Sequence, residues 1–175
     1  NILGDHQLYN ISTSIAAARK IFKVKDDDIK KGIQSIELKG RLQEIKKGKL
    51  KDIAGNNRLV IDGGHNISAS LSIANWIKDQ NQEVNLICGM LKDKDHLEFM
   101  KSFEGLVKSV TLINIPNQES SISKEEFNNK ITDLNLNLNL SNSIKESIKS
   151  LSRNENAITL CVGSLYLVGE ILNLN

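Results

Sequence analysis

Residues 58–66, RLVIDGGHN, give the strongest indication of the fold of this chain. A short apolar run leads directly into an acidic residue and two glycines, which is typical of a buried strand that ends in a tight turn. The following segment, ISASLSIANWIKDQ at 67–80, has apolar residues at helical spacing. The sequence therefore predicts a strand, a turn and a helix in succession, the unit from which parallel sheets are built.

The same alternation continues to the end of the chain. Further strands are predicted at 83–90, 109–115 and 157–163, and helices at about 94–103, 123–131, 142–152 and 164–172. The run LNLNLNL at 134–140 fits a strand by its alternation, or a low-complexity segment of an Asn-rich chain. The predicted fold class is α/β, with a Rossmann-like, mostly parallel sheet and helices on both faces.

The first 57 residues have a different pattern. Apolar residues at helical spacing predict a helix over 6–22, and three aspartates at 26–28 predict the start of a helix over 27–34. Residues 36–47 alternate enough to suggest an extended segment. The basic, glycine-containing stretch 46–57 is interpreted as a hairpin or linker.

Composition narrows the class of protein. Of 175 residues, 39% are hydrophobic and only 4% are aromatic, so the core must consist mainly of aliphatic side chains. The 23 basic and 21 acidic residues give a net charge of +2, which indicates neither a nucleic-acid partner nor an anionic membrane. No apolar run approaches the roughly 20 residues of a membrane span.

Cysteine and histidine usage gives no metal signature. Cys88 and Cys161 lie in apolar runs and are predicted to be small buried residues in a reducing compartment, so we expect a cytoplasmic protein. The three histidines, His6, His65 and His96, are scattered along the chain. No metal site is therefore predicted.

Three predicted strand ends carry distinctive residues, at 62–66, 89–95 and 163–166. Ligands of open α/β sheets bind outside the carboxyl ends of the strands. Asp62 could bind ribose hydroxyls or a cation, and His65 could donate to a phosphate or a carboxylate. Alternatively, Asp62 and Asn66 only cap the next helix.

The other candidates have equally ordinary alternatives. Ser164 could mark an anion site or cap a helix, and the charged turn LKDKD at 91–95 could be solvated surface. His6 and Asn10 lie one helical turn apart and could face one ligand, or solvent. Arg41 could bind phosphate or be one more surface cation. Trp76 has the spacing of a core residue, and no G-x-x-x-x-G-K-[ST] phosphate loop is present.

Five short segments together resemble folylpolyglutamate synthase/dihydrofolate synthase, a branch of the Mur ligase superfamily. In chain order they are GDHQLYN (4–10), GRLQ (40–43), LVIDGGHN (59–66), GMLKDKD (89–95) and GSLYLVGE (163–170). The chain departs from the family pattern at Gly64, where alanine is usual, and at Ile67, where proline is usual. Neither departure removes a polar group.

The resemblance implies an ATP-dependent ligase that adds L-glutamate to folate or dihydropteroate through an acyl phosphate, with Mg²⁺ as a cofactor. It assigns ATP contacts to Asn10 on the adenine side, Arg41 at the phosphates and Asp62 at the ribose. It assigns the incoming glutamate to three further residues: His65, Ser164 and Tyr166. It assigns no catalytic residue and no metal ligand to this chain.

The resemblance also implies a division of the chain. Residues 1–37 would be the tail of a central ATP-binding domain, 38–57 a linker and hairpin, and 58–175 the C-terminal ligase domain. The chain begins with Asn1, and we expect a fragment that is inactive alone because the phosphate loop and magnesium ligands lie upstream. The complete enzyme is expected to be a monomer. Alternatives are a Mur-type peptidoglycan peptide ligase and a non-catalytic α/β nucleotide-binding module.

Overall fold

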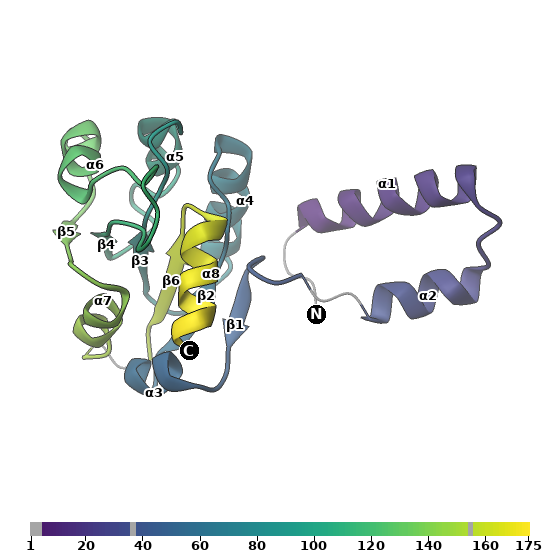
Figure 1. The fold of residues 1–175 in the computed structure, drawn as a ribbon, viewed down its shortest axis with the longest axis horizontal. Helices are drawn as coiled ribbons and strands as arrows, with labels where there is room; N and C mark the ends of the chain where they lie inside the picture. Colours follow the sequence, from purple (N-terminus) through teal and green to yellow (C-terminus); the bar gives the residue numbers. More distant parts are fainter. Residues whose placement is uncertain (1–4, 36–37, 154–155) are drawn as a thin grey trace.

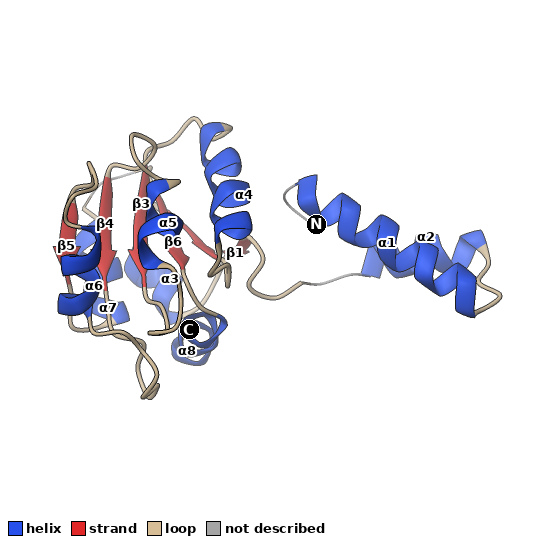
Figure 2. Ribbon diagram, turned by 90° about the horizontal axis from the view of Figure 1, so that it is seen from above, coloured by secondary structure: helices blue, strands red, loops and turns tan. Residues whose placement is uncertain are grey.

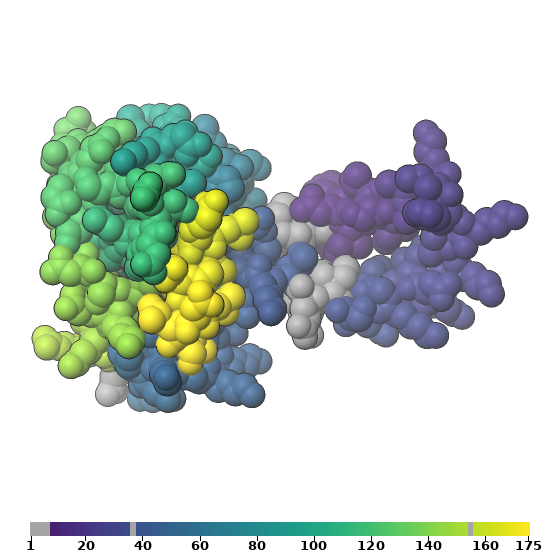
Figure 3. Space-filling view, viewed as in Figure 1, coloured from purple at the N-terminus to yellow at the C-terminus, as the bar shows by residue number. Residues whose placement is uncertain are grey.

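A computed structural model describes residues 5–35, 38–153 and 156–175 of the chain. It consists of an α/β body and a helical hairpin that forms a separate lobe at one side (Figures 1 and 3). The α/β body carries the sheet and almost all of the buried side chains. It therefore determines where a site can form.

The sheet of the body has six strands within the described residues, in the order β1-β2-β6-β3-β4-β5. They are β1 (Gln43–Ile45), β2 (Arg58–Ile61), β3 (Val84–Cys88), β4 (Ser109–Leu112), β5 (Leu138–Leu140) and β6 (Ile158–Val162). Only the edge strand β1 is antiparallel to its neighbour. The last strand in the chain, β6, lies in the interior of the sheet between β2 and β3, so the C-terminal segment completes the core.

Helices cover both faces of this sheet because the central strands are apolar on both sides. One core cluster lies under α4 (Ile67–Lys78), α5 (His96–Lys101) and α6 (Lys124–Ile131). The other lies under α3 (Lys49–Ala54), α7 (Ile144–Leu151) and α8 (Leu165–Leu174). Figure 1 shows α5 and α6 on one side of the strands and α3 and α7 on the other, and Figure 2 looks onto the face that α5 and α6 cover. The predicted fold class is confirmed.

Most helices begin where a polar side chain caps the first turn. Such a side chain accepts a hydrogen bond from one of the otherwise unpaired N–H groups of that turn. The caps of α4, α5, α6, α7 and α8 are Asn66, Asp95, Ser123, Ser143 and Ser164. The predicted helices over 123–131, 142–152 and 164–172 are thus confirmed with small shifts at their ends.

Helix α3 corrects one prediction, because the stretch 46–57 is not a hairpin or simple linker. Its first residue follows Gly48, which has no side chain to cap a helix. The cap comes instead from Asn175, whose Oδ1 accepts hydrogen bonds from the backbone N–H groups of Leu50 and Lys51 at 3.1 and 3.4 Å. Leu50 and Ala54 then bury fully against the sheet. The stabilising partners are more than 120 residues away in sequence, so no local pattern reveals this helix.

The hairpin is formed by α1 (Asp5–Ile21) and α2 (Asp26–Ser35), which confirm the helices predicted over 6–22 and 27–34. Side chains from both helices, including Ile11, Ile15 and Ile29, line an apolar hollow of about 620 Å³ between them. Leu8 of α1 and Phe22, which directly follows that helix, remain about two thirds exposed. The hairpin therefore buries only part of its apolar surface within the described residues.

Several smaller expectations are also decided by the structure. The alternating run at 134–140 forms a strand only at its end, as β5, and β4 is shorter than the segment predicted. Trp76 and both cysteines are buried in the core. Every described helix is either too short or too polar to cross a membrane.

Candidate functional site

The candidate site lies at the carboxyl edge of the sheet, where β2, β6 and β3 end side by side. Because β6 inserts between β2 and β3, the turns at 62–66, 163–164 and 89–95 meet at this edge. The turns also bond to one another: the N–H of Gly163 donates to the carbonyl of Gly64 at 3.0 Å, and that of Gly89 to Val162 at 3.3 Å. The three turns singled out in the sequence thus form one continuous surface.

Asp62 lies at the end of β2 and is only 5% exposed. One carboxylate oxygen accepts a hydrogen bond from the backbone N–H of Gly64 at 2.6 Å, and the other from that of Leu42 at 2.8 Å. Asp62 therefore does not cap α4; Asn66 caps it, by accepting from the N–H of Ala69 at 2.9 Å. The alternative interpretation, that these residues cap the helix, is therefore wrong for Asp62 and correct for Asn66.

The two glycines of this turn are required by close packing. A Cβ at Gly63 would lie 2.3 Å from Leu165 and 3.3 Å from Nη1 of Arg41. A Cβ at Gly64 would lie 2.8 Å from Ala69 and 2.9 Å from Asp62. The chain thus has Gly64 in place of the alanine usual in the family, at a position where its own neighbours leave little room for a methyl group.

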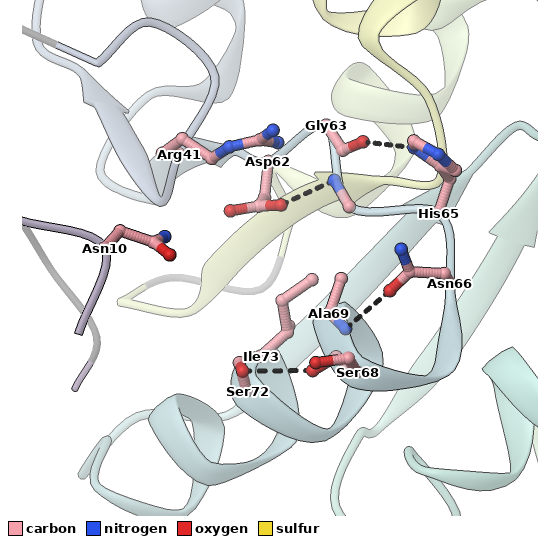
Figure 4. Close-up of a pocket in the computed structure, with 11 residues that line it drawn as sticks. Asn10, Arg41, Asp62, Gly63, His65, Asn66, Ser68, Ala69, Ser72 and Ile73 are labelled. Carbon is pink, nitrogen blue, oxygen red and sulfur yellow. Dashed lines mark hydrogen bonds between the residues drawn. The ribbon is translucent and has the colours of Figure 1, made fainter. Parts of the chain in front are cut away.

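A polar pocket of about 270 Å³ opens in front of this turn. Its walls include three predicted ATP-contacting residues, Asn10, Arg41 and Asp62, and also His65. Figure 4 shows Arg41 lying over the 62–64 turn and Asn10 entering from helix α1. The pocket therefore brings together residues that are 52 positions apart in the chain, from Asn10 to Asp62.

A second hollow of about 220 Å³ lies on the other side of His65. It is lined by His65, Ser164 and Tyr166, the three residues that the resemblance assigns to glutamate. Nδ1 of His65 is 3.1 Å from the carbonyl oxygen of Gly63, and because a carbonyl only accepts, this nitrogen carries the proton. Nε2 is then the ring nitrogen left for a ligand.

Ser164 is buried and caps α8 by accepting from the N–H of Tyr166 at 3.1 Å. The cap interpretation is therefore correct for this serine, although its hydroxyl hydrogen can still donate to a ligand. Tyr166 is 58% exposed and Leu165 is 50% exposed, so two large side chains stand at the rim of the hollow.

The structure adds Lys94 to this second hollow, a residue that the sequence suggested was solvated surface. Its Nζ donates to Asp93 at 2.9 Å, and this hydrogen bond holds the pKa of the Asp93 carboxyl below its usual value. The side chain of Lys94 remains 27% exposed. The signal available in the sequence was the position of GMLKDKD directly after a buried strand.

Neither hollow has His6 or a cysteine among the described residues that line it. The side chain of His6 lies outside the described residues. Burial raises the pKa of the Cys161 thiol to about 12, and burial together with the nearby Cys161 raises that of Cys88 still further. Both thiols are therefore protonated and unreactive at neutral pH. Within the described parts of the chain, no three His, Cys, Asp or Glu side chains gather closely enough to hold a metal ion.

His96 supports the turn that carries Lys94. It is buried, and its Nε2 donates to the carbonyl oxygen of Leu91 at 2.9 Å while its ring packs edge-on against Phe127. Burial is the main cause that lowers the pKa of His96 below its ordinary value of 6.5. The folded chain thus prefers the neutral ring.

We therefore expect acid to destabilise the fold through His96. As pH falls below 6.5, the unfolded chain binds the proton first, so the free energy of unfolding decreases until pH reaches the lower pKa of the folded state. His96→Gln, which does not titrate, should remove this part of the pH dependence. Urea unfolding of both proteins at several pH values from 7 to 5 checks it; parallel profiles would contradict it.

Comparison with known proteins places this geometry in a family. Residues 44–174 match the family described as dihydrofolate synthetase, C-terminal domain. The chain belongs to this family. The match covers every strand of the sheet except the first residue of β1, and it covers the helices from α3 to α8 completely.

Curated relatives are similar over nearly the whole chain. The dihydrofolate synthase/folylpolyglutamate synthase of Haemophilus influenzae is 25% identical over 93% of this chain, which corresponds to 41% of that relative. A similarly described enzyme of Buchnera aphidicola is also 25% identical, over 96% of this chain. The chain therefore spans about two fifths of the length of these relatives.

Solved structures share the fold. A folylpolyglutamate synthase of Mycobacterium tuberculosis complexed with ADP and AMPPCP has a TM-score of 0.86 at 15% identity, over 99% of this chain and 40% of that one. E. coli FolC in complex with DHPP and ADP has a TM-score of 0.77 at 22% identity, over 94% and 38%. The family resemblance suggested by the five sequence segments is thus confirmed.

Proposed function

We propose that this chain is the glutamate-accepting part of an ATP-dependent ligase that joins L-glutamate to folate or dihydropteroate. The observation that carries the proposal is the pair of adjoining hollows on either side of His65. One contains Asn10, Arg41 and Asp62, and the other contains a lysine and a serine beside an exposed tyrosine. Relatives in the same family are described as dihydrofolate and folylpolyglutamate synthases.

In the first hollow, Arg41 would act on the phosphates of ATP. A guanidinium remains charged at all physiological pH values and binds phosphoryl oxygens through two parallel N–H groups. Asp62 would accept from the ribose hydroxyls and Asn10 would contact the adenine side. Negative charge develops on the transferring phosphoryl group and on the acyl phosphate, and Arg41 would stabilise it.

In the second hollow, the carboxylates of L-glutamate would find complementary donors. Lys94 supplies a cation and Ser164 a hydroxyl hydrogen, and the ring of His65 lines the same hollow. The aromatic ring of Tyr166 would border the ligand. The glutamate amine would then face the first hollow, from which it attacks the acyl phosphate, and inorganic phosphate leaves.

The phosphate loop and the Mg²⁺ site would lie in a preceding portion of the enzyme. Among the described residues, no three His, Cys, Asp or Glu side chains are arranged so that they could hold a metal ion. We propose the division that the sequence suggests, with 1–37 as the tail of the ATP-binding domain and 58–175 as the ligase domain, and with the intervening 38–57 carrying β1 and α3, which pack onto the ligase domain. The partly exposed apolar hairpin would pack against that preceding portion, and the complete enzyme would be a cytoplasmic monomer without nucleic-acid or membrane partners.

The test of this proposal is binding to the isolated chain, followed residue by residue by NMR. L-glutamate should shift the signals of the second hollow, and ATP those of the first. Lys94→Ala should weaken glutamate binding by about tenfold, as expected for loss of one charged hydrogen bond. Lys92→Ala is the matched control, since Lys92 lines a different hollow beside Glu119. Glutamate that shifts no signal around 164–166 would refute the assignment.

The same sample tests whether the chain needs a preceding portion. Incubated with ATP, Mg²⁺, dihydropteroate and labelled glutamate, it should form no labelled product above background. Sustained turnover by the isolated chain would show that the phosphate-binding machinery is not upstream.

A further inference from the structure

Asp62 engages the connection between the hairpin and the sheet as well as its own turn. Its two carboxylate oxygens accept from the backbone N–H groups of Leu42 and Gly64. Leu42 belongs to the 40–42 turn, which is 20 residues earlier in the chain. The carboxylate therefore ties two distant segments together at a buried position.

The 40–42 turn has a conformation that needs external support. Leu42 has a φ of +43°, a left-handed value that is unfavourable for a residue with a Cβ. Gly40 has a φ of +66°, and its carbonyl oxygen accepts from the N–H of Gly63 at 2.8 Å. A Cβ at Gly40 would lie 2.7 Å from Val168, so the turn also packs directly against α8. The bond from the N–H of Leu42 to Asp62 acts on the strained residue itself.

Arg41 lies between these two anchored residues. Its guanidinium extends past Gly63, close enough that a Cβ there would be 3.3 Å from Nη1 (Figure 4). The position of this side chain thus depends on how the turn is fixed to the sheet edge.

We propose that Asp62 is a positioning residue, which latches the 40–42 turn to the sheet and thereby holds Arg41 in the first hollow. The proposal rests on the proposed function and deepens it, because it gives Asp62 a role toward the phosphates in addition to the ribose. The two roles are compatible, since a carboxylate oxygen can accept more than one hydrogen bond.

The decisive variant is Asp62→Asn. In the wild-type chain both oxygens of Asp62 accept a backbone hydrogen bond. An amide has only one acceptor oxygen, so the NH₂ group of the asparagine would face the N–H of either Leu42 or Gly64, and that N–H would lose its hydrogen bond. Backbone amide exchange at Leu42 or Gly64 should become at least about tenfold faster, the effect of losing one charged hydrogen bond. ¹⁵N relaxation should show increased motion at Nε of Arg41. Asp79→Asn, which removes the same charge from an exposed residue at the end of α4, should change neither.

The wild-type chain gives an independent measurement in case the variant does not fold. The Leu42 amide should exchange as slowly as the Gly63 amide, which is bonded to Gly40. Exchange of Leu42 at the rate of an unstructured peptide would overturn the latch. Unchanged exchange of both amides in folded Asp62→Asn would overturn it as well.

Binding of tripolyphosphate, which has no ribose, separates the two roles of Asp62. If the latch positions Arg41, Asp62→Asn should weaken this binding about as much as Arg41→Ala does. If Arg41→Ala weakens tripolyphosphate binding and Asp62→Asn does not, the positioning role of Asp62 is overturned. If the wild-type chain binds no tripolyphosphate, the proposed nucleotide function fails, whereas the exchange measurements still decide the latch.

Discussion

Replacing Gly163 with alanine is expected to lower the free energy of unfolding by roughly 2–6 kcal/mol. The residue has a φ of +108°, and strain of this kind costs about 1–3 kcal/mol in a residue with a side chain. The new Cβ would also lie 2.7 Å from the carbonyl oxygen of Gly89 and 2.8 Å from Met90. Such overpacking adds about 1–3 kcal/mol, and the backbone oxygen cannot rotate away as a flexible side chain could.

The strain caused by Gly163→Ala should also disturb the candidate site, because the N–H of Gly163 bonds to the carbonyl of Gly64 in the 62–66 turn. A domain of this size is stable by only about 5–15 kcal/mol, so a shift of this magnitude is large. Urea unfolding, followed by circular dichroism, measures it. The matched control is Gly169→Ala, six residues later within α8, where an added Cβ meets nothing within 4 Å. This variant should gain up to about 1 kcal/mol, because alanine favours the helix. Equal midpoints for Gly163→Ala and the wild type would contradict the prediction.

Replacing Arg41 with alanine should have the largest effect on catalysis. We expect kcat/KM for ATP to decrease on the order of 100-fold, comparable to the loss of one preorganised donor to a developing anion. The chain must first be joined to the preceding portion of a relative, such as the Haemophilus influenzae enzyme, of which it matches 41%. The kcat/KM of Arg41→Lys should lie between those of the parent enzyme and Arg41→Ala, since lysine keeps the charge but lacks the planar pair of donors.

The control for this prediction is Arg153→Ala, which removes the same charge from the loop that precedes β6, at the opposite end of that strand from the site. Its kcat/KM should stay close to that of the parent enzyme. A similar loss in both variants would indicate a general electrostatic effect on the protein, and no loss in Arg41→Ala would remove this residue from the ATP site.

Much of the fold could be predicted from local sequence. The apolar runs of β2, β3 and β6 and the polar caps at Asn66 and Ser164 are each decided within a few residues, because burial and capping depend on short-range spacing. The three glycine-containing strand ends were also visible as candidates. Their grouping at one edge follows from any parallel arrangement of these strands.

The rest depended on partners far away in the chain. Helix α3 is capped by Asn175, and β6 enters the sheet between two strands that precede it by 70 residues or more. Lys94 looked like solvated surface until the turn after β3 was placed beside α8. The local sequence pattern does not indicate these contacts, since the residues that make them are of common types in their own segments.

The same distinction applies to the turn at 62–66. Apolar spacing and backbone freedom are properties of the residues themselves, so the local sequence is enough to predict that a buried strand ends there in an acid and two glycines. The role of the acid depends on long-range contacts, since Asp62 bonds to Leu42 across 20 residues instead of capping its own helix. A carboxylate that is only 5% exposed must find hydrogen-bond donors, and which donors are within reach depends on how the whole chain is folded.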